Sequence, residues 1–125
     1  MEQVFNKLVR DNIPEIIENK GEIPVVRVLG DDEFRLELIK KLGEECAEVA
    51  TATSSIDVLQ ELADLLEVIK ALARIENKNL DNIVALAGQR EATRGAYTKR
   101  IFLEKVIKPD GEKIWKKWLL IWMML

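Results

Sequence analysis

Five carboxylates stand at helical spacing in two neighbouring segments of the chain. Glu44, Glu45 and Glu48 lie in the first segment, and Glu61 and Asp64 lie in the second. On an α-helix, residues three apart lie about 60° apart around the axis and share one side. Like charges at this spacing repel one another unless a cation neutralises them. Carboxylate oxygens are the ligands that Mg²⁺ and Mn²⁺ prefer in proteins, so the pattern favours a hard divalent cation over zinc.

Two long amphipathic helices are predicted to carry these acids. The first spans about 31–52, with Asp31 and Asp32 as candidate N-caps. The second spans about 56–76, after Ser54 and Ser55, which can cap it. The apolar positions of the first helix are Leu38, Ile39, Leu42, Cys46, Val49 and Ala50. Those of the second are Val58, Leu62, Leu65, Leu66, Ile69 and Leu72.

The acids occupy distinctive places relative to these apolar stripes. Glu45 and Glu48 flank the first stripe, whereas Glu61 falls inside the second and Asp64 lies at its border. A carboxylate on a core-facing stripe is costly unless it is paired or bound to a metal. A short connection favours antiparallel packing of the two helices, which lets the four carboxylates meet across the seam.

The opposing interpretation is a set of surface acids paired with Lys40 or Lys41. For Glu44, this surface interpretation and a functional role carry about equal weight. For Glu61 the surface interpretation is weaker, because no lysine or arginine follows three or four residues later on the same helix. A di-iron carboxylate bundle is excluded because that design needs histidine ligands, and the chain has none.

The rest of the chain is also predicted to be mainly helical. A short helix begins near Pro14 and ends near Lys20–Gly21, and a further helix covers about 80–94, with Ile83, Leu86 and Ala87 inward and Gly95 as its stop. The segment 25–29 is a short strand or simply extended chain. We therefore predict an all-α fold, a small antiparallel bundle of about four main helices. Its domain would cover 1–108, with 109–125 as an apolar and basic extension.

Composition excludes several classes of protein. The sequence has 125 residues, a net charge of −3, one cysteine and no histidine. The absence of histidine excludes the Ser-His-Asp triad, the Cys-His pair and the common zinc sites. A single cysteine permits no intrachain disulfide, and the N-terminus lacks the apolar core of a signal peptide, so we expect a cytoplasmic protein. No apolar run reaches the length of a membrane span, and we expect neither a membrane nor a nucleic-acid partner.

Three segments of the sequence resemble one family. The acids Glu44-Glu45-x-x-Glu48 and Glu61-x-x-Asp64, with twelve residues between the two groups, resemble the signature of the all-α nucleoside triphosphate pyrophosphohydrolases, the MazG-like proteins. Residues 6–15 are similar to the KLVRDKIPE stretch of the phosphoribosyl-ATP pyrophosphohydrolase-like subgroup, and residues 94–104 to its RGGFEKRIFLE stretch. The resemblance covers about residues 4–106. Asn12 replaces a common lysine, and Ala96-Tyr97 replaces Gly-Phe.

The resemblance implies a metal-dependent reaction on a nucleotide. Mg²⁺ or Mn²⁺ would be held by Glu45, Glu48, Glu61 and Asp64, with Glu44 as a nearby catalytic acid that orients water. Cleavage between the α- and β-phosphates would release a monophosphate and pyrophosphate. The residues implied in substrate binding are Lys7, Arg10, Asp11, Arg94, Lys99 and Arg100. Two alternatives stay open: a phosphoribosyl-ATP hydrolase of histidine synthesis, and a non-catalytic helical-bundle subunit.

The C-terminal part of the chain is basic and then strongly apolar. Residues 99–117 carry seven cations and three acids. All three tryptophans of the chain, Trp115, Trp118 and Trp122, lie at helical spacing near its C-terminal end. A helix that packs on the bundle or on a second subunit is the plain interpretation; an interfacial anchor and an altered end of the coding region are the others. Leftover apolar surface predicts an oligomer, and the resemblance to the family implies a homodimer or homotetramer.

Overall fold

The computed structural model describes residues 1–109 and 115–125, and this part of the chain is all-helical. Its helices are α1 (Ile13–Asn19), α2 (Asp31–Thr51), α3 (Ser55–Ile75), α4 (Leu80–Arg94) and α5 (Trp115–Met124). The described residues contain no strand, so 25–29 is irregular chain rather than the alternative short strand. The all-α prediction is confirmed, and the helix bounds lie within a residue or so of those predicted.

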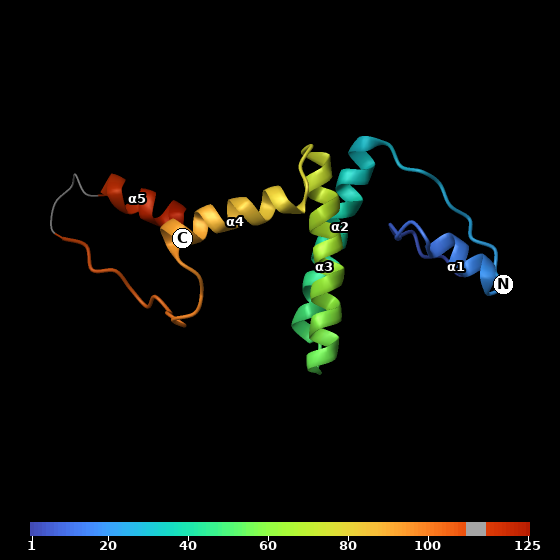
Figure 1. Ribbon diagram of the computed structural model, residues 1–125, viewed down its shortest axis with the longest axis horizontal. Helices are drawn as coiled ribbons and strands as arrows, with labels where there is room; N and C mark the ends of the chain where they lie inside the picture. The colour runs from blue at the N-terminus through green and yellow to red at the C-terminus, as the bar shows by residue number, and fades with distance from the viewer. Residues whose placement is uncertain (110–114) are drawn as a thin grey trace. The chain divides into compact units, whose positions relative to one another are not determined.

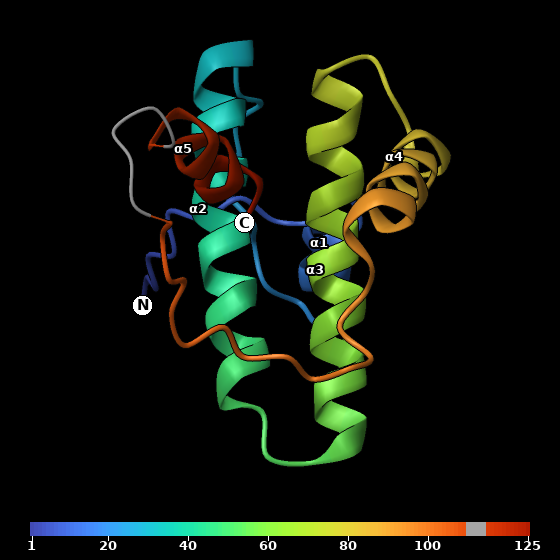
Figure 2. The same ribbon diagram turned by 90° about the vertical axis from the view of Figure 1, so that its left-hand side faces the viewer.

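The chain divides into two compact units, Met1–Arg90 and Glu91–Leu125, and the division falls inside α4. The predicted domain boundary near residue 108 stays a prediction. The predicted C-terminal extension, 109–125, includes residues 110–114, which lie outside the described residues. In the first unit, α2 and α3 pack closely along their length and run antiparallel, joined by the short connection 52–54 (Figures 1 and 2). This helical hairpin is consistent with a small helical bundle.

The seam between α2 and α3 follows a spacing of three and four residues on each helix. On α2 it includes Leu38, which is only 4% exposed, together with Leu42 and Val49. On α3 it includes Leu65 and Val68. This is the spacing of a coiled-coil-like contact, in which one narrow stripe of each helix is covered.

Several residues predicted to point inward are exposed instead. The seam of α2 passes through Glu45, so Cys46, one residue and about 100° further round, faces away from α3. Ile39 and Ala50 are exposed for the same reason. The wide stripe of α3 is likewise only partly covered: Leu62 and Leu66 remain 44% and 40% exposed. On α4, Ile83 is half-buried, whereas Leu86 and Ala87 are exposed.

The helix ends are set by local hydrogen bonds. At the start of α3 the Ser54 hydroxyl accepts a bond from the Asp57 N–H at 3.1 Å, as predicted for a capping serine. At the end of α1, Gly21 has a φ of +82°, and the Gly21 and Glu22 N–H groups bond back to Glu18 and Ile17. This is a Schellman motif, which favours glycine at the left-handed position.

The prediction that Asp31 or Asp32 caps α2 is wrong. Gly30 is the N-cap residue of α2, and no side chain of the described residues caps that end. Asp31 and Asp32 lie in the first helical turn instead. Their negative charges there are favourable because the N-terminus of a helix carries a partial positive charge.

The Ser54 cap gives a direct test of the α2–α3 connection. We expect Ser54→Ala to lower the free energy of unfolding by about 1 kcal/mol, because an N–H in the first turn of α3 loses its partner. Urea unfolding followed by circular dichroism measures the change. Ser55→Ala is the matched control, since Ser55 is the first residue of the helix and its change should stay within about 0.5 kcal/mol. Equal effects of the two substitutions would contradict the assigned cap.

The remaining helices have simple local features. The side chains of Asn79 and Asn82 each accept a bond from the other residue's N–H, at 3.1 and 3.0 Å, and this reciprocal pair begins α4. Gly95, with a φ of +81°, follows the end of α4, as predicted. In the second unit, Trp122 of α5 is 75% exposed. Among the described residues, no helix is both long enough and apolar enough to cross a membrane.

Candidate metal centre

Three acids from the two packed helices meet at the seam. Glu45 of α2 and Glu61 and Asp64 of α3 each offer a carboxylate oxygen, and these oxygens lie within 4.8 Å of one another. The helical hairpin brings them together: Glu45 lies on the buried stripe of α2, and Glu61 continues the stripe of Leu65 and Val68 on α3. Three of the four predicted ligands therefore form one cluster.

Burial makes this cluster costly without a cation. Glu45 is only 9% exposed and is the one buried charged residue of the described chain. The Oε2 atoms of Glu45 and Glu61 are both shielded from solvent, and neither has a hydrogen-bond partner among the described residues. A buried carboxylate oxygen without a partner is strongly unfavourable. An all-oxygen donor set with two such atoms fits a hard divalent cation such as Mg²⁺.

The acids raise one another's pKa values. A hydrogen bond with Glu48, which two carboxyl groups can form only by sharing a proton, is the main cause that raises the pKa of Glu61 to about 7. Burial and the charges of Glu48, Asp64 and Glu45 act in the same direction. Burial is also the main cause that raises the pKa of Glu45, followed by the charges of Glu48 and Asp64. Mutual repulsion of this kind is what a bound cation would relieve.

Glu48, the fourth predicted ligand, lies at the edge of the cluster. Its residue is exposed, and it is not among the three acids whose oxygens converge. It nevertheless lies close enough to Glu61 and Glu45 to raise both pKa values. Its role as a fourth ligand therefore stays a prediction.

Two cations already touch acids of this region. Arg10, from the segment before α1, donates from Nη2 to Asp64 Oδ1 at 2.7 Å. Lys41, one turn before Glu44 on α2, pairs with Glu44 Oε2 at 3.2 Å. The Lys41 contact agrees with the interpretation of Glu44 as a surface acid in an ion pair. A catalytic role of Glu44 stays a prediction.

No family model matches this chain. No solved structure matches it either. A segment of 46 residues, 37% of this chain, is 52% identical to an uncharacterized protein of Mycolicibacterium smegmatis (strain ATCC 700084 / mc(2)155). The matched segment spans 47% of that protein, so this chain covers about half the length of the relative that it matches. The comparison therefore establishes a relative and leaves the activity to be argued from the site.

The other predicted substrate-binding residues are distributed over the two units of the chain. Lys7 and Asp11 are exposed and belong to the first unit, like Arg10. Arg94, Lys99 and Arg100 are exposed and belong to the second unit. Their roles remain predictions from the sequence.

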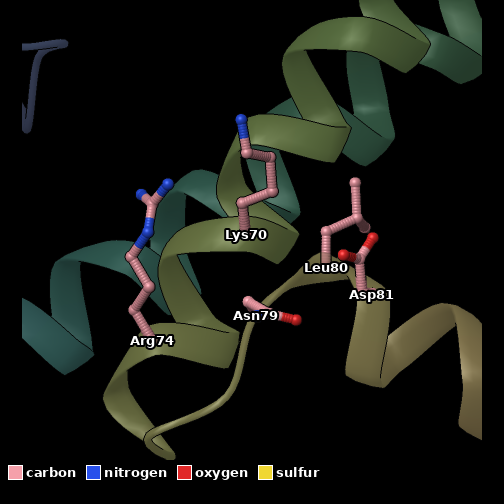
Figure 3. A pocket seen from close by; sticks show the side chains of 5 residues that line it. All are labelled: Lys70, Arg74, Asn79, Leu80 and Asp81. Atoms are coloured by element: carbon pink, nitrogen blue, oxygen red, sulfur yellow. The ribbon is translucent and has the colours of Figure 1, made fainter.

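A pocket that the sequence did not predict lies further along α3. It has a volume of about 200 Å³ and is lined by Lys70, Arg74, Asn79, Leu80 and Asp81. Figure 3 shows Lys70 and Arg74 rising from α3 beside the beginning of α4. Lys70 is six residues beyond Asp64, which is about 9 Å along the helix, and it pairs with Glu67 at 2.8 Å. The i, i+3, i+7 spacing of Glu67, Lys70 and Arg74 is the signal that marks one charged face.

Proposed function

We propose that this protein is a Mg²⁺-dependent nucleotide pyrophosphohydrolase of the MazG-like kind. It would cleave the α–β phosphate bond of a nucleoside triphosphate or related nucleotide, giving a monophosphate and pyrophosphate. The observation that carries the proposal is the convergence of Glu45, Glu61 and Asp64 at a helix seam, where two shielded oxygens have no hydrogen-bond partner within residues 1–109 and 115–125. The resemblance of three sequence segments to that family supports it.

The acid cluster suits a phosphate reaction better than a purely structural role. A structural ion pair needs an equal number of cations, and within the described residues Arg10 reaches only Asp64. In the proposed site, Glu45, Glu48, Glu61 and Asp64 hold the cation. When bound, Mg²⁺ neutralises phosphate oxygens and lowers the pKa of a coordinated water. A water oxygen would form a new bond to the α-phosphorus as the bond from that phosphorus to the α–β bridging oxygen breaks. Pyrophosphate would leave with the bridging oxygen, and the proton of the water would pass to solvent.

The remaining residues of the site would bind and orient the substrate. Lys7 and Arg10 would donate hydrogen bonds to phosphate oxygens, as charged donors do in phosphate sites. Asp11 would bind a sugar hydroxyl or orient Arg10. Glu44 would accept a hydrogen bond from the attacking water once Lys41 shares its charge with the substrate. The proposal extends the same phosphate-binding role to Arg94, Lys99 and Arg100 of the second unit.

The proposal is tested by pyrophosphate release from a panel of ribo- and deoxyribonucleoside triphosphates and phosphoribosyl-ATP. We expect release from at least one member with Mg²⁺ present, and none when EDTA removes the metal. The preferred member names the substrate and decides between a triphosphate and the phosphoribosyl-ATP alternative. A folded protein that is inactive on the whole panel and does not bind Mg²⁺ would instead favour the non-catalytic subunit.

Exposed apolar residues on α3 support the further proposal that the protein is a homo-oligomer. Ile56, Leu59 and Leu62 are 68%, 66% and 44% exposed, and they lie on one side of the helix. A contiguous apolar stripe on a helix is typical of a surface that packs on another element. Size-exclusion chromatography with light scattering measures the oligomeric state, which we expect to be a dimer or a tetramer. We also expect the protein to be cytoplasmic.

A further inference from the structure

Arg10 is the residue that links the N-terminal segment to the acid cluster. Its guanidinium lies 2.7 Å from Asp64, although the two residues are 54 positions apart in the sequence. The Arg10 carbonyl accepts a hydrogen bond from the Ile13 N–H at 3.1 Å, which ties its backbone to the start of α1. The backbone is therefore anchored, while the long side chain is free to adopt other rotamers.

Arg10 neutralises the cluster incompletely. It contacts Asp64, while the shielded Oε2 atoms of Glu45 and Glu61 have no hydrogen-bond partner in the described part of the chain. A guanidinium is too broad to enter a group of oxygens that lie within 4.8 Å of one another, whereas a small divalent ion binds several carboxylates at once. The single positive charge of Arg10 therefore lies at the edge of the cluster and neutralises one acid. A divalent cation at the centre would bind all three.

The Arg10–Asp64 pair is also weakly held. The side chains of Arg10 and Asp64 are 57% and 44% exposed. Ion pairs with this degree of exposure contribute little because water screens them. A second acid, Glu67, lies near enough to feel Arg10: its pKa is lowered mainly by a hydrogen bond from Lys70 and further by the charge of Arg10. Glu67 is therefore a second negative charge near Arg10, and the exposed Arg10 side chain can leave Asp64 at small cost.

We propose that Arg10 is an exchangeable counter-ion, which pairs with Asp64 when no metal is bound and transfers to substrate phosphate when Mg²⁺ takes its place. This inference rests on the proposed function, because it assumes that Asp64 is a metal ligand. Its consequence is coupling: Mg²⁺ displaces Arg10 from Asp64, and the displaced guanidinium then favours binding of a polyanion at the same site. Without a polyanion, Mg²⁺ would bind less tightly than it would to the same acids without Arg10. With a polyanion present, Mg²⁺ would bind more tightly, because the displaced Arg10 then contacts phosphate.

The exchange predicts opposite effects of one substitution on two ligands. Without nucleotide, Arg10→Gln should tighten Mg²⁺ binding about two- to fivefold, the range expected for losing a competing exposed ion pair. With Mg²⁺ saturating, the same variant should bind inorganic tripolyphosphate about tenfold more weakly, because a charge-assisted hydrogen bond is lost. Isothermal titration calorimetry measures both dissociation constants. Arg10→Lys, which keeps the charge but not the fork of donors, should give intermediate values for both ligands.

Arg35→Gln is the matched control. Arg35 also joins distant parts of the chain, donating to Glu76 at 2.9 Å, and its side chain is 54% exposed. The Arg35→Gln substitution removes the same charge and a similar ion pair at a place away from the cluster. The dissociation constants for Mg²⁺ and for tripolyphosphate should therefore stay at the wild-type values. Unchanged or weaker Mg²⁺ binding in Arg10→Gln, with normal binding in the wild type, overturns the exchange alone. A wild-type protein that binds no Mg²⁺ overturns the exchange and the proposed function together.

Discussion

Glu61→Gln is expected to abolish Mg²⁺-dependent pyrophosphate release at neutral pH while leaving the helical fold intact. Glutamine preserves the shape of the side chain but removes the charge that would hold the metal. Substitution of residues that merely orient metal ligands costs about 10- to 100-fold in affinity or activity, so loss of a ligand should cost at least about 100-fold. The proposed substrate assay measures activity, and circular dichroism measures helix content.

The same variant should be at least as heat-stable as the wild type when no metal is present. The neighbouring acids make a charged Glu61 unfavourable, as its raised pKa of about 7 indicates, and the neutral amide relieves that repulsion. Glu76→Gln is the control, because Glu76 belongs to the Arg35 pair at the end of α3, and it should retain full activity. Retained activity in Glu61→Gln would remove Glu61 from the set of metal ligands.

The stability of the metal-free protein is expected to fall as the pH rises from 5.5 to 8. The pKa of Glu61 is raised from 4.5 to about 7 in the folded state, so the folded protein binds this proton more tightly than the unfolded chain does. The stabilisation from that proton is fully present below about pH 4.5 and is lost as the pH rises through 7. The raised pKa of Glu45 acts in the same direction.

Other acids do not reverse this trend within the chosen range. The pKa of Glu33 is lowered, mainly by a hydrogen bond from Arg27, and that of Glu67 is lowered, mainly by a hydrogen bond from Lys70. Their contributions are present above about pH 4.5 and are lost only in more acidic solution. A pH series of melting temperatures in EDTA therefore isolates the cluster, and Glu61→Gln should flatten the slope.

Mg²⁺ should restore stability where the protons have been lost. At pH 8, Mg²⁺ at about 100 times its dissociation constant adds about 2.7 kcal/mol, which corresponds to a rise of roughly 10 °C in Tm for a domain of this size. Sodium chloride at the same ionic strength is the control and should give a much smaller change. A melting temperature that responds neither to pH between 5.5 and 8 nor to Mg²⁺ would contradict a cation site at this seam.

Local signals in the sequence determined the helices and the identity of the acids. The predicted 56–76 helix is found at Ser55–Ile75 because Ser54 caps its start, and that bond involves only neighbouring residues. Gly21 ends α1 through its left-handed backbone, again a local property. The spacing of Glu61 and Asp64 on one helix was likewise sufficient to predict that they share a side.

Only the tertiary structure decided which face of α2 meets α3 and which partner each acid has. The predicted stripe of α2 included Leu38 together with Ile39 and Cys46. The seam keeps Leu38 but runs through Glu45 instead of Cys46, because the packing of two helices covers only a narrow arc of each. Helical periodicity leaves neighbouring arcs nearly equivalent in a sequence, and contact with the partner helix selects between them. The Arg10–Asp64 pair depends on chain folding over 54 residues, a separation at which sequence spacing carries no geometric information.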